Sequence, residues 1–444
     1  MAYIAGEARE QVTMFPPTLD EFIPADHLCR VIEAFVNRLA IRELGFARAE
    51  PAETGRPGYD PRDLLKLYLY GYMNQLRSSR RLEAECQRNV EVMWLLGRLR
   101  PDYKSIAEFR RLHGEAVKEA GAELVGLARE TGLVRGEWVA IDGSKFRAVS
   151  SAARVRERDR VQRYLEEMEE ADAREDEDIV IDHSAMQAAL EKLRQDPEPE
   201  ARFMRTTEGK RPAYNVQAAV DAECGVIVAQ AVTTEATDNR SLLAMAEAAQ
   251  QAVGGRESLH VVADAGYSNG EQAAECEARG IEPHVPANRG VNHAGKGTLF
   301  DRSDFSYDES TDTMLCPAGA RLHRKAVQKK RRQVVYVGEA AVCGACPLRA
   351  GCTTVKRRTV KRHLYEDALE RMQQRATTEV MRLRRCVVER VFAALKYGSF
   401  GHPRFLLRGR RGAQTEISLA TLAYNLKRMM VVLGGMGLRA ILAD

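Results

Sequence analysis

The sequence predicts an α/β protein, in which a mixed sheet is flanked by helices, preceded by an all-α segment and interrupted by a cysteine-rich insertion. Helical patterns with capping residues fill about the first 130 residues. After Gly136, runs with strand composition alternate with helical patterns. Four cysteines then cluster within a basic stretch. These three observations together indicate the fold class.

The composition is that of an ordinary soluble protein. The 444 residues suffice for two or three domains, and 45% of them are hydrophobic and 29% charged. The start MAYIAGEAREQVTMF lacks the basic region and apolar core of a signal peptide. The sequence has no uninterrupted apolar run of about 18 residues. We therefore expect a cytoplasmic protein without a membrane segment.

The charge is distributed unevenly although the formal net charge is only +4. The stretch from Leu165 to Glu200 holds 14 acidic and three basic residues, whereas the stretch from Ala320 to His363 holds 13 basic residues and one acid, Glu339. So dense a basic run suggests a local surface for a polyanion. The alternative is a solvated loop with no partner.

Helix start signals divide the first segment into short helices. Asp26 can cap a helix through HLCRVIEAFVNRLAI, and Asp60 followed by Pro61 can start one through RDLLKLYLYGYMNQL. Ser105 and Glu108 form a capping box for AEFRRLHGEAVKEAGAELVGLARETGL. Short helices with tight turns and several arginines suit a DNA-binding domain. A helical bundle for dimerisation or scaffolding explains the pattern almost as well.

The second part alternates strands and helices in the order three strands, helix, strand, helix, strand. The expected strands are EWVAIDGSKFRAV, AYNVQAAVD, GVIVAQAVTTE, LHVVADA and IEPHVPA. Asp238 or Asn239 can cap the helix SLLAMAEAAQQAV, and Ser268 with Glu271 can form the capping box of EQAAECEARG. A long helix from about Thr377 and a last helix around ISLATLAYNLKRMMVVL end the chain.

Four carboxylates stand where chemistry could use them. Asp142 follows the buried run WVAI, but Asp-Gly is also a common hairpin signal. Asp221 heads a short connection between two strands, where the turn interpretation prevails. Asp264 ends VVA before a helix, and ligands gather at such strand ends in α/β sheets. Glu389 lies within the long helix VMRLRRCVVERVFAALKYG.

Glu389 has three cations on its side of that helix. At about 100° per residue, Arg382, Arg385 and Lys396 fall within roughly 40° of it, and apolar residues take the other sides. A solvated face with an Arg–Glu pair is the ordinary interpretation of such a stripe. In a nucleic-acid enzyme the same cations would hold the phosphates that flank the scissile bond.

Taken together, two strand-end aspartates and one helical glutamate can hold two divalent cations. Two ions about 4 Å apart let one activate a water or a 3′-hydroxyl while the other stabilises the leaving oxygen of a phosphoryl displacement. Oxygen ligands of this kind suit Mg²⁺ or Mn²⁺. We therefore expect Asp142, Asp264 and Glu389 to converge on one metal site.

The cysteine cluster has the spacing of a structural zinc site. One Cys-x2-Cys knuckle and two further cysteines lie in a basic loop, and with four protein ligands no position stays open for water. Unliganded thiols are the alternative. The four expected ligands are Cys316, Cys343, Cys346 and Cys352.

The stretches VAIDGSKFRA, PAYNVQAAVD and VVADAGYSNGEQ, with the spacing Arg385-x3-Glu389-x6-Lys396, carry a resemblance to a known family. With the order of elements of a ribonuclease-H-like core, the chain resembles bacterial insertion-sequence transposases of the DDE class over nearly its whole length. The segments IPADHL, GYDPRDLLKLYLYGYMNQLRSSRRLE, PDYKSIAEFRRLH and AYNLKRMM are similar to helical segments of that family. A tyrosine often stands in related transposases where this chain has Arg382.

The resemblance implies the ribonuclease-H-like fold and places the catalytic triad at Asp142, Asp264 and Glu389. It implies a transposase that cuts the ends of a mobile element and joins them to target DNA. An inactive or domesticated DNA-binding protein, or a metal-dependent nuclease without strand transfer, remains an alternative. We further expect a homodimer in the active complex and a location at the bacterial nucleoid.

We expect the chain to divide into two domains. Residues 1–130 form a helical DNA-binding or dimerisation domain, and residues 131–435 form the catalytic domain. A charged helical insertion at 151–205 and the basic cysteine insertion at 288–376 interrupt the latter. The first domain is expected to recognise the element's ends. The basic insertion is expected to contact phosphates through side chains that include Lys329, Lys330, Arg331 and Arg332.

Overall fold

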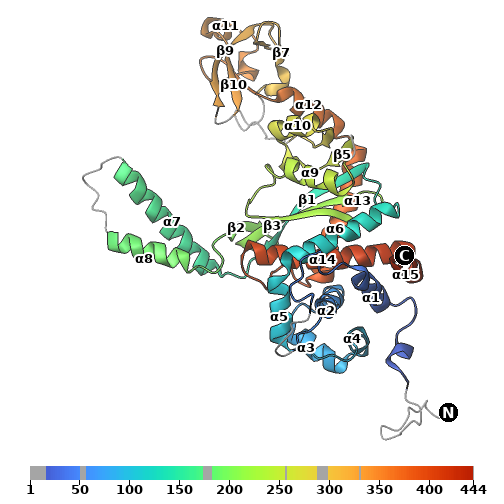
Figure 1. The fold of residues 1–444 in the computed structure, drawn as a ribbon. Coiled ribbons are helices and arrows are strands. Elements are labelled where there is room, and N and C mark those ends of the chain that lie inside the picture. Colours follow the sequence, from blue (N-terminus) through green and yellow to red (C-terminus); the bar gives the residue numbers. More distant parts are fainter. Residues whose placement is uncertain are drawn as a thin grey trace, which may run out of the picture. The chain divides into compact units, whose positions relative to one another are not determined.

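The computed structural model describes six stretches of the chain, residues 17–50, 57–173, 183–255, 258–287, 299–329 and 332–443. The chain packs as two compact units (Figure 1). The first comprises Met1–Arg135, Gly143–Ala236 and Glu389–Asp444, and the second Gly136–Asp142 and Thr237–Val388. The boundaries of these packing units therefore differ from the predicted boundary between a domain of residues 1–130 and a domain of residues 131–435. No helix in the described stretches is long and apolar enough to cross a membrane.

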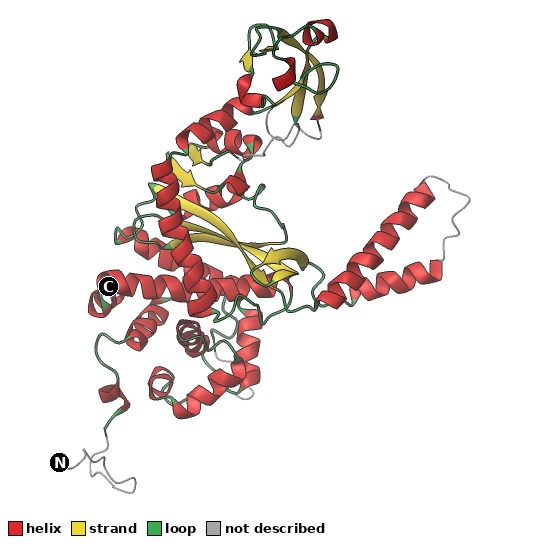
Figure 2. Cartoon of the chain, turned by 180° about the vertical axis from the view of Figure 1, so that it is seen from behind, coloured by secondary structure: helices red, strands yellow, loops and turns green. Residues whose placement is uncertain are grey.

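The first part of the chain is helical, as the sequence predicts, and Figure 2 shows no strand in its described residues. Its helices are α1 (Leu28–Arg38), α2 (Pro61–Met73), α3 (Ser79–Arg88), α4 (Val90–Leu95), α5 (Tyr103–Leu112) and α6 (Gly114–Glu130), after a short 3-10 turn, η1 (Leu19–Phe22).

Two of the predicted helix starts differ from the observed ones. The Asp60 carboxylate caps α2 by accepting from Arg62 N, with Pro61 at the first position, as predicted. His27, rather than Asp26, caps α1. The predicted capping box is wrong, because Asp102 caps α5 earlier in the chain by accepting from two backbone N–H groups.

The charged insertion consists of two helices and one strand, α7 (Ala152–Ala173), α8 (His183–Arg194) and β2 (Arg202–Thr206). The sequence indicates helix here but misses β2. Residues 174–182, which lie between the two helices, are outside the described stretches.

The main sheet is mixed, as predicted, with strand order β2-β3-β1-β5-β6 and β4 paired to β3. Its strands are β1 (Trp138–Arg147), β3 (Gly209–Asp221), β4 (Ile227–Thr233), β5 (Leu259–Val262) and β6 (Ile281–His284), with β2. Strand β3 pairs antiparallel with β2 and β4, whereas β5 pairs parallel with β1 and β6. The turn interpretation of Asp221 is confirmed, since its carboxylate accepts from Glu223 N between β3 and β4.

Strand β1 passes straight through Asp142 and Gly143, so the hairpin interpretation of that dipeptide is wrong. Beyond it, the backbone of Arg147 donates to Pro403 O and accepts from Phe405 N. The side chain of Phe146 is buried against two further aromatic rings, Phe400 and Phe405. These contacts keep the strand extended, because a turn at Gly143 would move Phe146 and Arg147 away from their partners.

Two helices of the second unit accompany its parallel strands. They are α9 (Leu242–Ala252) and α10 (Gly270–Ala278), and α12 (Glu366–Arg375) packs on α10. Asn269 caps α10 by accepting from Glu271 N, one residue after the predicted Ser268.

The cysteine insertion contains a separate five-stranded sheet with its own core. Its antiparallel strands, in the order β11-β10-β9-β8-β7, are β7 (Ser306–Asp308), β8 (Thr313–Leu315), β9 (Arg321–Gln328), β10 (Gln333–Val337) and β11 (Thr359–His363), beside α11 (Ala340–Gly344). The buried side chains between them are Phe305, Met314, Leu322, Val334, Tyr336 and Val360.

Four helical segments end the chain, namely α13 (Thr378–Ala393), a π-helix η7 (Ala394–Ser399), α14 (Gly409–Leu433) and α15 (Gly435–Ala443). Helix α14 is the centre of the first unit, where it packs on α6, α2 and β4. The amide of Asn425 accepts from Ile227 N and donates to Ile227 O, which fixes α14 against β4.

A buried carboxylate on α14 ties the N-terminal helices to the C-terminal ones. Glu416 is fully buried, and its Oε1 accepts from Leu406 N and Leu407 N at 2.6 Å. Its Oε2 accepts from Arg77 Nη1 at 3.0 Å and from the Tyr72 hydroxyl at 3.4 Å. Four donors thus compensate the desolvation of one carboxylate.

We expect Glu416→Ala to lower the free energy of unfolding by about 3–5 kcal/mol, because it leaves the Arg77 guanidinium buried without its carboxylate. Denaturant unfolding followed by circular dichroism measures the change. Glu130→Ala, at the exposed end of α6, is the control and should change it by less than about 0.5 kcal/mol. Equal losses for the two variants would contradict this account.

Candidate active site

Asp142 and Asp264 lie side by side on two adjacent parallel strands. Asp264 follows the end of β5, as predicted, whereas Asp142 lies within β1, which continues to Arg147 instead of ending at the aspartate. Ala140 on β1 pairs with Val262 on β5, and the two aspartates follow these residues by two positions each. Alternate residues of a strand point to the same face, so both carboxylates lie on one face of the sheet. The expected meeting of these two residues is therefore present in the structure.

A buried arginine stands between the two carboxylates. Arg384 Nη2 on α13 lies 2.9 Å from Asp142 Oδ1 and 3.5 Å from Asp264 Oδ2. The Arg384 side chain is only 10% exposed, whereas that of Asp264 is 46% exposed. One guanidinium nitrogen thus serves as the shared counter-ion of two acids, and the pair stays accessible on the Asp264 side.

Sequence reasoning missed Arg384, because it treated the sides of the helix away from Glu389 as apolar. A signal was present. Arg384 precedes the buried Val387 and Val388 by three and four residues, so it shares their face. An arginine on an apolar helix face needs a carboxylate partner, since a buried charge is otherwise costly.

A third acid, Asp238, and a tyrosine belong to the same surroundings. Burial raises the pKa of Tyr267 above its ordinary range, and the nearby negative charges of Asp238, Asp142 and Asp264 raise it further. Tyr267 therefore stays protonated and can donate its hydroxyl proton. Asp238 was predicted as a helix cap, but Ser241 is the residue before α9.

The small residues after Asp264 have a structural reason. Asp264 Oδ1 accepts from Gly266 N at 2.8 Å and so caps the 3-10 turn η2 (Ala265–Tyr267). A Cβ on Gly266 would lie 2.9 Å from Asp264 Oδ1 and 3.9 Å from Asp238 Oδ2. Glycine is therefore required for the turn to pass this close to the carboxylates, and Asp264 serves as both a turn former and a site residue.

These residues fit a divalent cation. Carboxylate oxygens are the ligands that Mg²⁺ and Mn²⁺ prefer. The position of Arg384 Nη2, close to one oxygen of each aspartate, shows that a positive charge between them is favoured. A metal ion bound between the two aspartates would replace the Arg384 guanidinium as their counter-ion.

Glu389 lies on the same helix as Arg384 but in the other packing unit, whose boundary falls after Val388. Its side chain is exposed, as are those of Arg382 and Arg385. The structure therefore brings two of the three predicted catalytic acids together and leaves the third as a prediction. Lys396 lies in the π-helix, so the α-helical spacing assumed for it does not hold.

The four clustered cysteines line one pocket in the insertion, with Leu322 and Arg358 beside them. Burial raises the pKa of the Cys352 thiol, and the three other thiols act in the same direction. Helix α11 carries Cys343, and Cys346 follows it. The structure thus brings together the residues predicted to bind zinc, while zinc binding itself stays a prediction.

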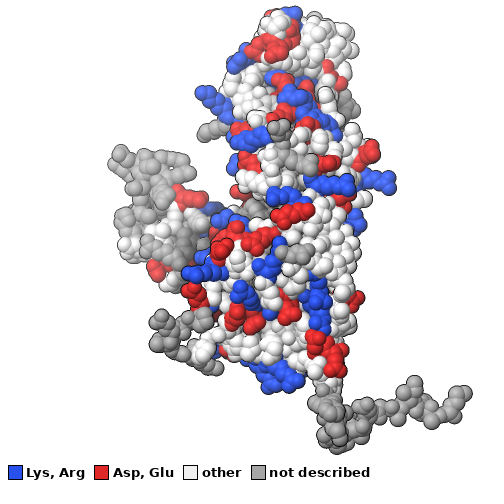
Figure 3. Space-filling view, turned by 45° about the vertical axis from the view of Figure 1, so that its right-hand side comes forward, with Lys and Arg blue, Asp and Glu red and all other residues white. Residues whose placement is uncertain are grey.

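The basic run of residues 320–363 carries less unpaired positive charge in the structure than its sequence suggests. Arg324 pairs with Asp312 at 3.0 Å and Arg362 with Asp367 at 2.6 Å, so part of the charge is neutralised within the fold. Lys and Arg are interspersed with Asp and Glu on the face shown in Figure 3.

Of the four phosphate contacts predicted in the run, Lys329 is exposed and Arg332 forms an ion pair with Glu271. Lys330 and Arg331 lie outside the described residues. Lys329 and Arg332 line a polar pocket together with Arg240, so two of the predicted contacts face one hollow.

We expect Arg384→Gln to destabilise the metal-free protein by about 1–3 kcal/mol, because the two carboxylates lose their counter-ion. Mg²⁺ or Mn²⁺ should restore more stability to this variant than to the wild type. Thermal unfolding with and without each ion measures both effects. Arg382→Gln, an exposed change on the same helix, is the control. If the two variants behaved alike, Arg384 would not act as the counter-ion.

Comparison with known families agrees with this geometry. Residues 17–112 match a family described as Transposase domain (DUF772). Residues 173–426, more than half of the chain, match the family described as Transposase DDE domain. A search of curated proteins finds none that matches. The resemblance to insertion-sequence transposases is thereby confirmed, and the chain belongs to the DDE transposase family.

Proposed function

We propose that the protein cuts DNA at the ends of a mobile element and joins the 3′-hydroxyl ends to target DNA. The observation that carries the proposal is the pair of carboxylates on adjacent parallel strands, Asp142 and Asp264, which share the Arg384 guanidinium within a chain of the DDE transposase family. Such an arrangement suits phosphoryl transfer, where negative charge must be neutralised at the reacting phosphate.

In this proposal Asp142, Asp264 and Glu389 hold two Mg²⁺ or Mn²⁺ ions. When bound, these ions would supply activation of the attacking hydroxyl and stabilisation of the leaving oxygen. Asp142 and Asp264 hold their oxygens at a spacing set by the paired strands. Arg384 neutralises the pair beforehand and must withdraw from it. Glu389 has an exposed side chain on α13 and completes the set from the same helix.

The DNA is proposed to be held by cations around this centre. Arg382 and Arg385 are exposed on α13, and with Lys396 they would contact the phosphates that flank the scissile bond. Lys329, Lys330, Arg331 and Arg332 would contact phosphates without reading sequence. The proposal is supported at Lys329 and Arg332, which line the polar pocket that also contains Arg240.

The proposed division of labour follows the predicted domains. Residues 1–130 would recognise the element's terminal inverted repeats or provide a dimer contact, and residues 131–435 would carry the chemistry, with insertions at 151–205 and 288–376. The short helices of the first part are of the kind that enter a DNA groove. We propose a homodimer in the active complex, located at the nucleoid in the bacterial cytoplasm.

We expect Asp142→Asn, Asp264→Asn and Glu389→Gln each to lower cleavage and joining by roughly a hundredfold or more, because each removes a charge that the reaction needs. DNA binding, measured by fluorescence anisotropy, should change little. The assay uses end-containing DNA, a target duplex and Mg²⁺. Glu379→Gln, an exposed change in the first turn of α13, is the control and should retain activity.

The wild-type products separate the alternatives. Joined strands are expected of a transposase. Cut but unjoined ends would instead indicate a nuclease, and binding without cutting would indicate an inactive DNA-binding protein. Full activity of any one triad variant would remove that residue from the proposed site.

We also propose one structural zinc ion held by the four clustered cysteines, since they share one pocket. Cys343→Ser or Cys346→Ser should lose one zinc equivalent in native mass spectrometry, because three ligands hold the ion far more weakly than four. Cys386→Ser, an exposed change on α13, should keep it. An unchanged zinc content in both cluster variants would indicate plain thiols.

A further inference from the structure

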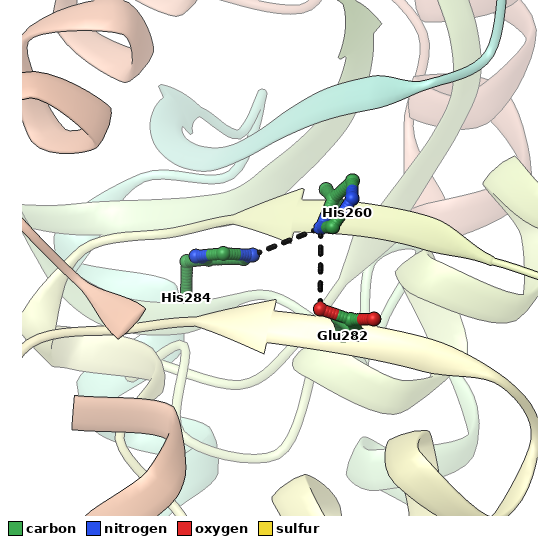
Figure 4. A group of neighbouring side chains, drawn as sticks. All are labelled: His260, Glu282 and His284. Atoms are coloured by element: carbon green, nitrogen blue, oxygen red, sulfur yellow. Dashed lines mark hydrogen bonds and ion pairs between the residues drawn. The ribbon is translucent and has the colours of Figure 1, made fainter. Parts of the chain in front are cut away.

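A second group of metal-ligating side chains lies on the main sheet, where sequence analysis singled out nothing. His260 comes from β5, and Glu282 and His284 come from β6 (Figure 4). His260 pairs in register with Glu282, and His284 follows Glu282 by two residues. The three side chains therefore lie on one face, and Figure 4 shows them pointing toward one another.

The distances between their ligand atoms match those around a tetrahedral metal ion. His260 Nδ1 lies 3.2 Å from His284 Nε2 and 3.4 Å from Glu282 Oε2. The three atoms all lie within 4.8 Å of one another. For metal–ligand bonds of about 2.0–2.1 Å, tetrahedral angles place neighbouring ligand atoms about 3.3–3.4 Å apart. No large movement is needed to enclose an ion.

The two imidazole rings are held in orientations that suit ligation. His284 Nδ1 lies 3.1 Å from Arg375 O, so its N–H donates there and the lone pair of Nε2 faces His260. A backbone carbonyl is a usual second partner of a metal-bound histidine. The His260 ring stacks on Trp138, with centroids 4.4 Å apart.

Hydrogen bonds alone do not give every ligand atom of His260, Glu282 and His284 a suitable partner. In the tautomer that carries its proton on Nδ1 and donates it to Arg375 O, Nε2 of His284 is an acceptor. The Glu282 carboxylate is an acceptor as well. His260 Nδ1 has at most one proton, and it faces both of them. Three electron-pair donors thus converge on at most one proton, whereas a metal ion would engage all three.

We propose that His260, Glu282 and His284 bind a transition metal ion of the Zn²⁺ class. Two imidazole nitrogens and one carboxylate favour zinc over Mg²⁺, which prefers an all-oxygen set. The side chains of His260 and Glu282 are 31% and 45% exposed, so water can take the fourth position.

The ion has a structural role in this proposal. It links β5 to β6, and β5 is the strand that leads to Asp264. Asp264 follows His260 by four positions, or roughly 13 Å of extended chain, so the ion lies too far away to join the carboxylate pair. The site is therefore independent of the proposed DNA chemistry.

Cobalt titration of the metal-stripped, full-length protein distinguishes this site from the cysteine cluster. Co²⁺ bound to thiolates gives an intense sulfur-to-metal charge-transfer band, whereas Co²⁺ bound by histidine and carboxylate gives only weak d–d bands. We expect the wild type to show a d–d signal that persists in Cys343→Ser. His260→Gln and His284→Gln should lose it, with at least tenfold weaker binding, and Zn²⁺ should compete for it.

Two further variants make the test decisive. His323→Gln, on β9, is the matched control and should keep the signal. Glu282→Gln changes a partly exposed side chain that should not affect folding, and it should weaken Co²⁺ binding if the site exists. The proposal is overturned if wild-type protein binds no Co²⁺ outside the thiolate site, or if Glu282→Gln and both histidine variants bind it as the wild type does.

Discussion

The closeness of Asp142 and Asp264 is the constraint to which the surrounding structure responds. Parallel pairing of β1 with β5, which ends at Ala140 and Val262 two residues before the aspartates, brings the two carboxylates together on one face. Two like charges in that position need a cation. Arg384 supplies it from α13, which explains why a guanidinium is buried beside apolar side chains such as Val387 and Val388.

Two kinds of metal ligand, carboxylate oxygens and imidazole nitrogens, lie on the same face of the sheet at different positions along the strands. Asp142 within β1 and Asp264 just after β5 carry oxygen donors, which suit hard cations, whereas His260 in β5 and His284 at the end of β6 carry imidazole nitrogens. Alternation along each strand allows this, because Trp138 and Asp142 share one side of β1 and His260 and Asp264 share one side of β5. Ligand type would therefore let two metals coexist on one sheet without exchanging places.

Local patterns predicted the order of strands and helices well, because capping residues and apolar runs depend on neighbours in sequence. Prediction failed where the conformation or role of a residue depends on residues far away in the sequence. Strand β1 continues through Asp142-Gly143 because Phe146 packs on rings more than 250 residues further along. Arg384 was missed for the same reason. His260 and His284 lie within short buried strands, where they resemble ordinary core residues until the register places them together.

The burial of Glu416 makes the N-terminal helices part of one folded unit with α14. Tyr72 and Arg77 lie at α2 and just beyond it, yet they supply two of the four donors to this carboxylate on α14. Removing the N-terminal helices would expose α14 and leave its acid short of partners, so a truncated chain would lose its structure. The N-terminal helices are therefore not a module that could be exchanged freely between chains. Any segment that replaced them would have to bring a matching arginine and tyrosine to the carboxylate.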